Sequence, residues 1–373
     1  MYDYGNYYTD NVSPFGLTDI KNVIIEDGVT SIGDNTFISC SNLASVTISN
    51  SVVSIGASSF SSCTNLQNIT IPDGVTDIGK DAFTSCYNLT SIIIPESVIR
   101  LGRNAFNMCM KLSNVSIGQN VTSIGEQTFS GCYSLISISI PNSVTSIGDL
   151  AFSNCASLAS IKIGDNVTSI GEYAFSACDS LTGITIPDSV TRIGKSAFSY
   201  CGNLSNVTIG NGVKSIGDFA FSDCIKLKNI TIGKGLESVG YSAFDYCIDI
   251  CDIYYEGTKS QWENVSFDLH NECLTTATIH FATVDEEPTK PETPEKPNIE
   301  PEITDKPDVL DTPSEPEVHK HSYTSTVTKT PTCTESGMVK FACNCGDTFN
   351  EYPAALGHSD ADGNGLCDVC GYG

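Results

Sequence analysis

The sequence is dominated by a phenylalanine that recurs every 23 residues and by a cysteine three residues after each copy. A fixed period of roughly 20–50 residues is typical of a solenoid, in which one repeat forms one coil and cannot bury its apolar side alone. We therefore expect stacked coils in which each phenylalanine packs on the phenylalanine of the next coil. The two columns are Phe37, Phe60, Phe83, Phe106, Phe129, Phe152, Phe175, Phe198, Phe221 and Phe244, and Cys40, Cys63, Cys86, Cys109, Cys132, Cys155, Cys178, Cys201, Cys224 and Cys247.

Each repeat also carries a strand signal, a strand stop and a glycine in a fixed order. In one copy, Ile92 and Ile94 form the alternating β-branched pattern of a strand, and Pro95 ends it because proline cannot donate to a sheet ladder. A later glycine is present in every copy, from Gly33 to Gly240. Glycine at a fixed position indicates either a positive φ or a close approach of two backbone segments.

The cysteine column is expected to hold free thiols that behave as small buried apolar groups. Disulfides between neighbouring coils would pull alternate coils together and disrupt a uniform stack. No histidine or second ligand recurs with the cysteines, so we do not expect them to bind metal.

The repeat Leu-x-x-Ile-x-Ile-Pro-x-x-Val-x-x-Ile-Gly-x-x-Ala-Phe-x-x-Cys resembles the BspA-like leucine-rich repeats over about two-thirds of the chain. The segment from Tyr254 to Trp262 resembles the cap that closes such arrays. The resemblance implies an α/β-type solenoid that is mostly β, wound as a right-handed superhelix with a parallel sheet on one face. Members of this family are typically surface or secreted proteins of bacteria and some protozoa, and adhesion is the role usually proposed for them. An extracellular or cell-surface location is therefore implied.

The chain divides by composition into five segments. After Thr283, prolines alternate with Glu and Asp and hydrophobic residues almost vanish, so no core can form there. We expect a disordered, extended spacer, with a wall-spanning or recognition segment as the alternative. The expected segments are an N-terminal flank (1–16), the repeat array (17–253), its C-terminal cap (254–282), the Pro/Glu-rich linker (283–318) and a small Cys/His-rich domain (319–373).

The small C-terminal domain contains residues suited to a metal site or to disulfides. A domain of this size usually needs such a staple, and four thiolates suit tetrahedral Zn²⁺. The predicted zinc ligands are Cys343, Cys345, Cys367 and Cys370. The segment resembles small Cys/His repeats of Gram-positive gut bacterial surface proteins, but its first cysteine pair is one residue short of their Cys-x-x-Cys spacing. Disulfides and free thiols remain alternatives. Calcium binding by residues 360–371 is a weaker interpretation, because the twelfth position is Gly371 and not glutamate.

The outward residues of the expected strands could form a ligand-binding face. In a strand, the residue between two buried neighbours points outward. These residues are small, mostly neutral and rich in hydroxyl groups, which fits either a solvated face or a broad protein- or glycan-binding face. No group of aromatic anchors marks a binding hot spot there. The candidate ligand-binding residues are Thr70, Asn114, Ser139, Lys162, Thr185, Asn206 and Thr208.

Charge and motif content exclude several classes of function. The formal net charge of −25 argues against nucleic acid and anionic membrane as partners. No run of roughly eighteen apolar residues indicates membrane insertion. The sequence has no Gly-x-Ser-x-Gly, phosphate-loop or His-Glu-x-x-His motif, so we expect neither enzymatic activity nor a cofactor in the array.

The sequence therefore favours a monomeric, non-enzymatic binding protein. Its expected partner is a protein, with host extracellular matrix as one candidate, or a glycan. Two alternatives remain open, a structural surface component without a specific ligand and a cytoplasmic scaffold. The scaffold is suggested by the first residues, which lack the basic and apolar segments of a signal peptide.

Overall fold

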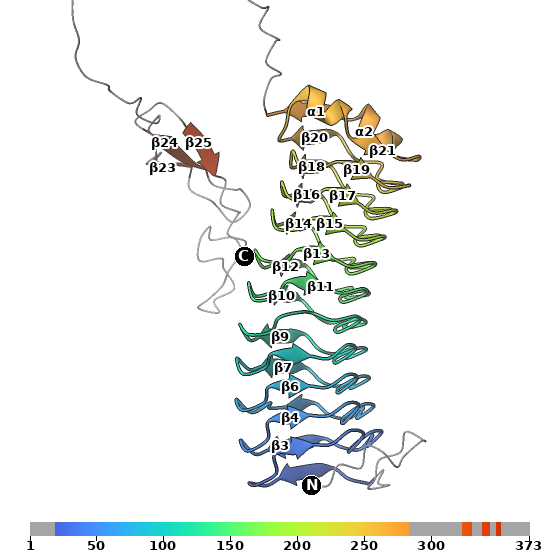
Figure 1. The fold of residues 1–373 in the computed structure, drawn as a ribbon, viewed down its shortest axis with the longest axis vertical. Coiled ribbons are helices and arrows are strands. Elements are labelled where there is room, and N and C mark those ends of the chain that lie inside the picture. The colour runs from blue at the N-terminus through green and yellow to red at the C-terminus, as the bar shows by residue number, and fades with distance from the viewer. Residues whose placement is uncertain (1–18, 283–322, 330–337, 344–347, 352–373) are drawn as a thin grey trace, which may run out of the picture. The chain divides into compact units, whose positions relative to one another are not determined.

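The computed structural model of the chain describes residues 19–282, 323–329, 338–343 and 348–351. The chain forms two compact units, residues 1–292 and 293–373. The first unit holds a mostly β parallel solenoid with few helices, which confirms the expected fold (Figure 1). No helix in the described ranges is both long and apolar enough to cross a membrane.

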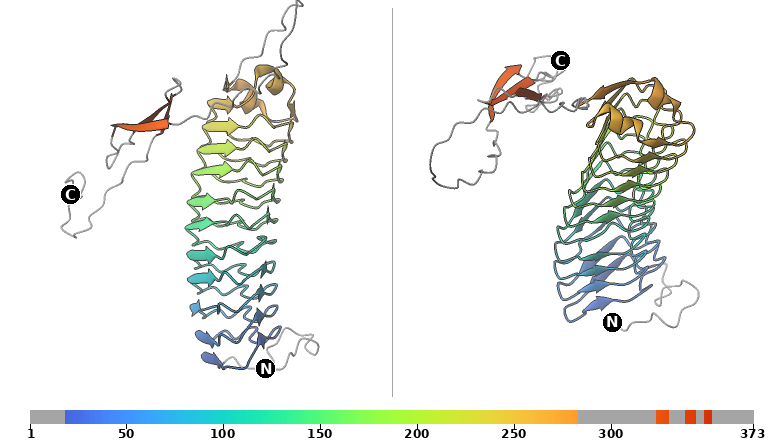
Figure 2. Two further views of the ribbon diagram at one scale, coloured as in Figure 1. Left: turned by 60° about the vertical axis from the view of Figure 1, so that its left-hand side comes forward. Right: turned by 45° about the horizontal axis from the view of Figure 1, so that its top comes forward.

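Each coil contributes one strand to a parallel sheet on one face of the stack, which Figure 2 shows as a row of arrows. These face strands carry alternating exposed and buried residues, as the sequence pattern predicts. They are β1 (Asn22–Ile25), β3 (Ser45–Ile48), β5 (Asn68–Ile69), β7 (Ser91–Ile94), β9 (Asn114–Ile117), β10 (Ser137–Ser139), β12 (Ser160–Lys162), β14 (Gly183–Ile186), β16 (Asn206–Ile209), β18 (Asn229–Ile232), β20 (Asp252–Tyr255) and β22 (Thr278–Phe281).

A second, shorter strand follows in most coils and pairs in parallel with its equivalents. These strands form a narrower ladder beside the face sheet. They are β2 (Ser31–Ile32), β4 (Ser54–Ile55), β6 (Asp77–Ile78), β8 (Arg100–Leu101), β11 (Ser146–Ile147), β13 (Ser169–Ile170), β15 (Arg192–Ile193), β17 (Ser215–Ile216), β19 (Ser238–Val239) and β21 (Ser266–Phe267).

The phenylalanine column forms the centre of the core, as predicted. Neighbouring rings from Phe37 to Phe244 stack with centroids 5.0–5.5 Å apart. Every ring is between 0% and 3% exposed. Burying one such side chain stabilises the fold by about 1.5–3 kcal/mol, so the column makes a large contribution to holding the coils together.

The cysteine column consists of free, buried thiols, in agreement with the prediction. From Cys63 to Cys247, each Sγ donates a hydrogen bond of 3.1–3.3 Å to the carbonyl oxygen of the phenylalanine in the preceding coil. Burial raises the pKa of Cys86, Cys155 and Cys201 to about 12, because the thiolate would be charged in an apolar interior.

The recurring glycine matches one of the two alternatives predicted for it. A Cβ added to any copy from Gly56 to Gly240, except Gly125, would come within 3.0 Å of the preceding coil. None of these glycines has a positive φ. Positive φ occurs instead two and six residues after the glycine, at positions occupied mainly by other residue types, such as Leu150 and Ala177. Of the two predicted alternatives, close approach of successive coils therefore accounts for the glycine.

The face sheet is interrupted twice, and each interruption leaves two neighbouring strands without a hydrogen-bond register. One break separates β5 from β7 and the other separates β12 from β14. The narrow ladder is interrupted once, between β8 and an isolated bridge that joins Ile124 to Ile147.

The segment 254–282 closes the C-terminal end of the stack. It contains α1 (Lys259–Glu263) and α2 (Glu272–Thr276), with a capping box formed by Thr258 and Gln261. Trp262 packs against the buried ring of Tyr255, with centroids 5.1 Å apart. These contacts cover the apolar end of the last coil.

The second unit contains a three-stranded antiparallel sheet of β23 (Tyr323–Lys329), β24 (Met338–Cys343) and β25 (Thr348–Glu351). Of the predicted zinc ligands, Cys343 is the last residue of β24, whereas Cys345, Cys367 and Cys370 lie outside the described residues. The linker predicted at 283–318 lies outside them as well. Zinc binding therefore stays a prediction.

Candidate binding face

All seven candidate residues lie along the face sheet, and their side chains are exposed. The local cause is the two-residue period of the strands, which buries Ile184 and Ile186 and leaves Thr185 between them in solvent. The candidates are Thr70 just after β5, Asn114 in β9, Ser139 in β10, Lys162 in β12, Thr185 in β14, and Asn206 and Thr208 in β16.

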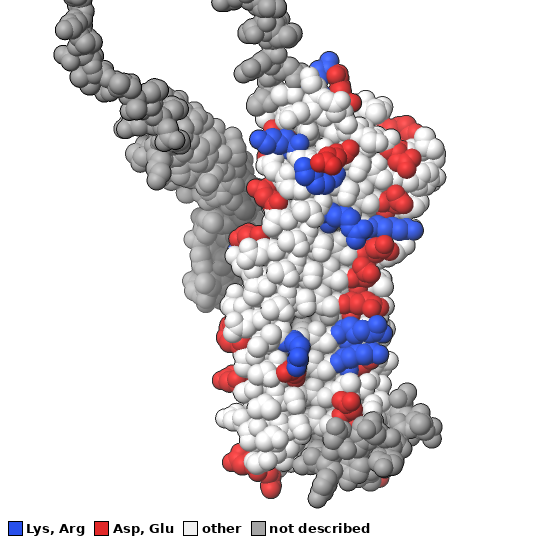
Figure 3. Space-filling view, in the orientation of Figure 1, with Lys and Arg blue, Asp and Glu red and all other residues white. Residues whose placement is uncertain are grey.

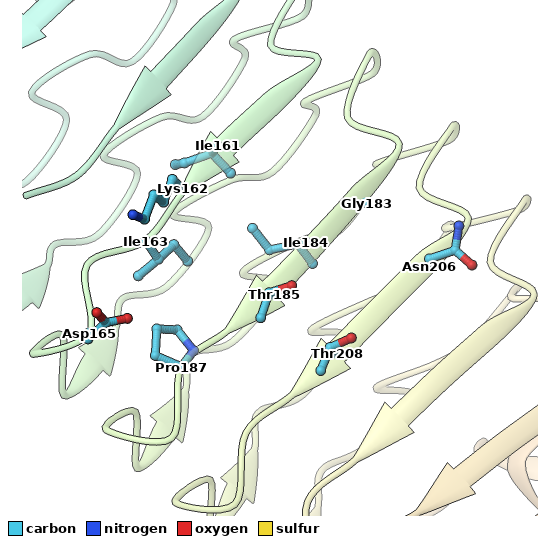
Figure 4. A pocket seen from close by; sticks show the side chains of 10 residues that line it. All are labelled: Ile161, Lys162, Ile163, Asp165, Gly183, Ile184, Thr185, Pro187, Asn206 and Thr208. Carbon is cyan, nitrogen blue, oxygen red and sulfur yellow. The ribbon is translucent and has the colours of Figure 1, made fainter. Parts of the chain in front are cut away.

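The structure gathers four of these residues around one groove and leaves the other three apart from it. Lys162, Thr185, Asn206 and Thr208 line the groove, whereas Thr70, Asn114 and Ser139 belong to earlier coils. The groove has a volume of about 490 Å³ (Figure 4). Its lining residues are Ile161, Lys162, Ile163, Asp165, Gly183, Ile184, Thr185, Pro187, Asn206 and Thr208.

The groove lies at the break between β12 and β14. Ile161 is partly buried there, as is Val115 at the equivalent position of β9, whereas Ile138 and Ile184 are buried. At the start of the strand, Gly183 replaces the serine, asparagine or aspartate that begins the corresponding strand segment in the coils from Ser45 to Asp252. The groove therefore coincides with both the missing side chain and the missing ladder.

A second groove of about 460 Å³ adjoins the first, with which it shares Asp165, Thr185, Pro187 and Thr208. It adds the carboxylates of Asp188 and Glu256. We call the two together the split groove.

The split groove carries one cation and several carboxylates. Lys162 is the one charged residue in the outward column from Thr47 to Tyr254, and its Nζ has no ion-pair partner in the described part of the chain. Asp165 accepts a hydrogen bond of 3.2 Å from Asn142 Nδ2. Glu256 accepts one of 2.8 Å from Asn211 Nδ2.

Charges elsewhere on the stack are arranged differently. Figure 3 shows Lys, Arg, Asp and Glu along one edge of the solenoid and mostly Asp and Glu along the opposite edge, with a mostly uncharged surface between them. Charges of opposite sign pair between neighbouring coils, as in the 3.2 Å contact of Arg103 with Glu126 and the 3.0 Å contact of Lys214 with Glu237. Exposed pairs of this kind contribute little to stability.

The lining of the split groove offers several kinds of group that can bind a ligand. It offers apolar contact, hydroxyl and amide groups, one ammonium group and carboxylates, with no histidine or cysteine among the lining residues. Within the described ranges, no group of three or more His, Cys, Asp or Glu residues is placed to hold a metal ion. The groove itself was not predicted, although two residues departed from their columns in the sequence, Gly183 as a lone glycine and Lys162 as a lone charge.

Comparison with protein families identifies a repeat family. The model for the BspA type leucine rich repeat region matches residues 12–136 and 122–251 with six copies, which together span more than half of the chain. A search among curated proteins finds no significant match.

Several solved structures are similar to the chain. A leucine-rich repeat protein from Bacteroides ovatus is 25% identical with a TM-score of 0.47, over 70% of this chain and 84% of that one. A leucine rich cell surface protein from Faecalibacterium prausnitzii is 31% identical with a TM-score of 0.36, over 67% and 82%. A leucine-rich repeat protein from T. pallidum is 32% identical with a TM-score of 0.41, over 43% and 78%.

Proposed function

The chain belongs to the BspA-type leucine-rich repeat family, and from this membership we propose that it is a non-enzymatic protein that binds a protein partner at the cell surface or outside the cell. The proposed partner is a protein of the host or of a neighbouring cell to which the chain adheres. Extracellular matrix proteins are included in this class. We propose further that the chain acts as a monomer and that the face sheet is the contact surface.

The observation that carries this proposal is the exposed face sheet. Its outward side chains are small and mostly uncharged, so a partner can approach without desolvating many charges. Parallel strands lie about 4.8 Å apart, so ten coils present a surface about 50 Å long. Such a length allows the roughly 800 Å² per partner that a stable protein complex buries.

The experiment compares two full-length variants of equal charge for binding to immobilised fibronectin, laminin and collagen. The face variant carries Ser116→Arg, Ser139→Arg and Thr208→Arg, all at exposed positions of the sheet. The control variant carries Thr145→Arg, Thr168→Arg and Thr191→Arg, at exposed positions between the face strands and the narrow ladder.

We expect the parent chain and the control variant to bind at least one of these proteins and the face variant to lose at least tenfold in affinity. Three added arginines on the contact surface would create steric and charge conflicts with a bound partner. Equal binding by both variants would contradict the role of the sheet. Absence of binding to all three matrix proteins would contradict the matrix-adhesion part of the proposal.

A further inference from the structure

We propose that the split groove is a subsite for an extended peptide segment of the protein partner, a segment with an acidic side chain at Lys162 and a basic side chain at Asp188 and Glu256. Apolar side chains of the segment would lie between these charges. This inference rests on the proposed function and specifies where on the face sheet the partner is held and by what chemistry.

The interrupted sheet supplies the apolar part of the subsite. In an intact stretch, β14 pairs with β16 residue by residue, from Gly183 with Asn206 to Ile186 with Ile209. β12 pairs with β10 on one side and has no such register with β14 on the other. The partly buried Ile161 therefore contributes apolar surface to an open groove, whose lining also includes the buried Ile163 and Ile184. Apolar side chains of a ligand can displace water there.

Gly183 keeps the groove open at low cost to the fold. Its backbone does not have a positive φ, and an added Cβ would meet only Asn206 O, at 3.6 Å. Space and conformation therefore both permit a side chain here, as in the other coils, where the position holds serine, asparagine or aspartate. Local packing therefore does not require glycine at this position. We infer that the glycine is there to leave space for a ligand.

The charges of the split groove select the ligand. The Nζ of Lys162 has no carboxylate partner within the described residues, so an acidic group of a ligand can pair with it. In the adjoining part, Asp188 and Glu256 have no cationic partner among the described residues, since their hydrogen-bond donors are the backbone N–H and the side-chain amide of Asn211. A ligand with both signs of charge complements this arrangement better than one with a single sign.

A peptide fits these walls better than a sugar. None of the lining residues is aromatic, so the groove lacks the flat apolar surface on which a sugar ring packs. Isoleucine and proline walls with threonine and asparagine at the rim suit the mixed side chains and the amide groups of a polypeptide.

The test is selection from a random peptide library displayed on phage, with the immobilised full chain as target. We expect the enriched peptides to carry an acidic and a basic residue separated by apolar residues. Lys162→Glu and Gly183→Ser should each weaken binding of a synthesised peptide at least tenfold, the first by reversing the charge and the second by filling the groove.

Two matched controls separate these effects from general damage. Lys228→Glu makes the same charge change at an exposed lysine outside the split groove, and Gly202→Ser adds the same side chain where nothing lies within 4 Å of the new Cβ. Both should bind the peptide like the parent chain. A peptide with lysine in place of its acidic residue should regain affinity for the Lys162→Glu variant.

Failure to enrich such peptides would overturn the inference. So would an enriched peptide that binds the Lys162→Glu and Gly183→Ser variants as tightly as it binds the parent chain. Binding of the same variants to matrix protein distinguishes this failure from failure of the proposed function. If matrix binding is lost in the face variant and kept in the two groove variants, the subsite is wrong and the face sheet stands. If the face variant also binds normally, the face sheet is not the contact surface, and that part of the proposed function is wrong.

Discussion

At the scale of single residues, the cysteine column combines small size with a weak hydrogen-bond donor. The carbonyl oxygen of Phe129 accepts the backbone N–H of Cys132 at 3.2 Å within its own coil and the Sγ–H of Cys155 at 3.2 Å from the next. The thiol therefore occupies the second lone pair of a buried carbonyl. Valine would fill a similar space without this hydrogen bond, and serine would bring a more polar group into the core.

These thiols should resist alkylation in the folded chain. Among the described cysteines, we expect iodoacetamide at pH 8 to modify exposed Cys251 rapidly and the ten column cysteines only after unfolding. The reason is burial, which also raises the pKa of Cys155 to about 12. Peptide mass spectrometry with and without denaturant measures the difference, with Cys251→Ser as control. Rapid labelling of Cys155 in the native chain would count against the buried column.

The same pKa shifts predict a loss of stability at alkaline pH. An unfolded thiol loses its proton near the ordinary value of 9.0, whereas the folded thiols of Cys86 and Cys155 keep theirs to about 12. Unfolding therefore releases protons in this window, and the free energy of unfolding falls as pH rises from about 9 to about 12. Urea denaturation at pH 8 and pH 10.5 measures the fall. A double variant Cys86→Val, Cys155→Val should show a smaller fall, and an identical fall would refute this cause.

The positive φ positions give a third prediction at this scale. Ala177 has a φ of 56°. A left-handed conformation costs an L-residue about 1–2 kcal/mol, more than the roughly 0.5–1 kcal/mol that glycine loses in entropy. Ala177→Gly should therefore stabilise the chain by roughly 0.5–1 kcal/mol, while Ala156→Gly, without positive φ, should destabilise it by a similar amount. Thermal melting compares the two, and a lower melting temperature for Ala177→Gly would contradict the strain argument.

At the scale of one coil, the recurring glycine sets the distance to the coil before it. Gly194 lies so close to Gly171 that an added Cβ would be 2.5 Å from its backbone, whereas at Gly125 the nearest atom is 3.5 Å away. Gly125 follows the interruption of the narrow ladder, where the strand pairing to the preceding coil is missing. The same repeat position therefore has two different packing requirements.

We expect Gly194→Ala to destabilise the chain by about 1–3 kcal/mol, because two backbone segments must move apart. Gly125→Ala should be neutral or stabilising by up to about 1 kcal/mol, because the methyl group fits in ordinary contact. Urea denaturation of both variants gives the comparison. Equal destabilisation by the two alanines would show that glycine is needed for its conformation, and that close approach is not the cause.

The structure of the coil was predictable at positions where every repeat has the same residue type. A 23-residue period without exception predicted the stacked interior, because only a fixed rise per coil brings Phe152 over Phe129 and under Phe175. The left-handed positions were not predictable, since residues as different as Asn154, Ala177 and Tyr200 occupy them. No residue type marks this conformation, which the turn geometry of the coil imposes.

The exposure of the candidate residues was predictable from the sequence, whereas the groove was not. The two-residue period placed Lys162, Thr185 and Thr208 on one exposed face, as the structure has them. The groove depends on a pairing that fails between β12 and β14, and pairing is a property of two coils together. Gly183 was visible as an exception in its column, but an exception alone does not say whether a strand bends, separates or stays in place.

At the scale of the whole molecule, the solenoid is a row of coils in which each contacts mainly its neighbours. The buried stack fixes the spacing of the face strands, so the outward side chains form a pre-organised surface. Pre-organisation lowers the entropy cost of binding, which allows a surface of small polar residues to hold a partner. The narrow ladder and the turns that follow it form other sides of the same coils. Protection of the face sheet by a bound partner can therefore be compared with protection of these sides in the same molecule.

Hydroxyl-radical footprinting of the full chain, with and without a bound matrix protein or selected peptide, tests the role of the face sheet most directly. On the sheet, Ile93 is 70% and Tyr254 45% exposed, and Ile161 lines the split groove. In the turns, Tyr200 is 60% and Tyr246 64% exposed. We predict that binding reduces the oxidation of Ile161 more than that of the other residues. The oxidation of Tyr200 and Tyr246 should not change. Protection of the two turn tyrosines with unchanged oxidation at all three sheet residues would contradict binding through the face sheet.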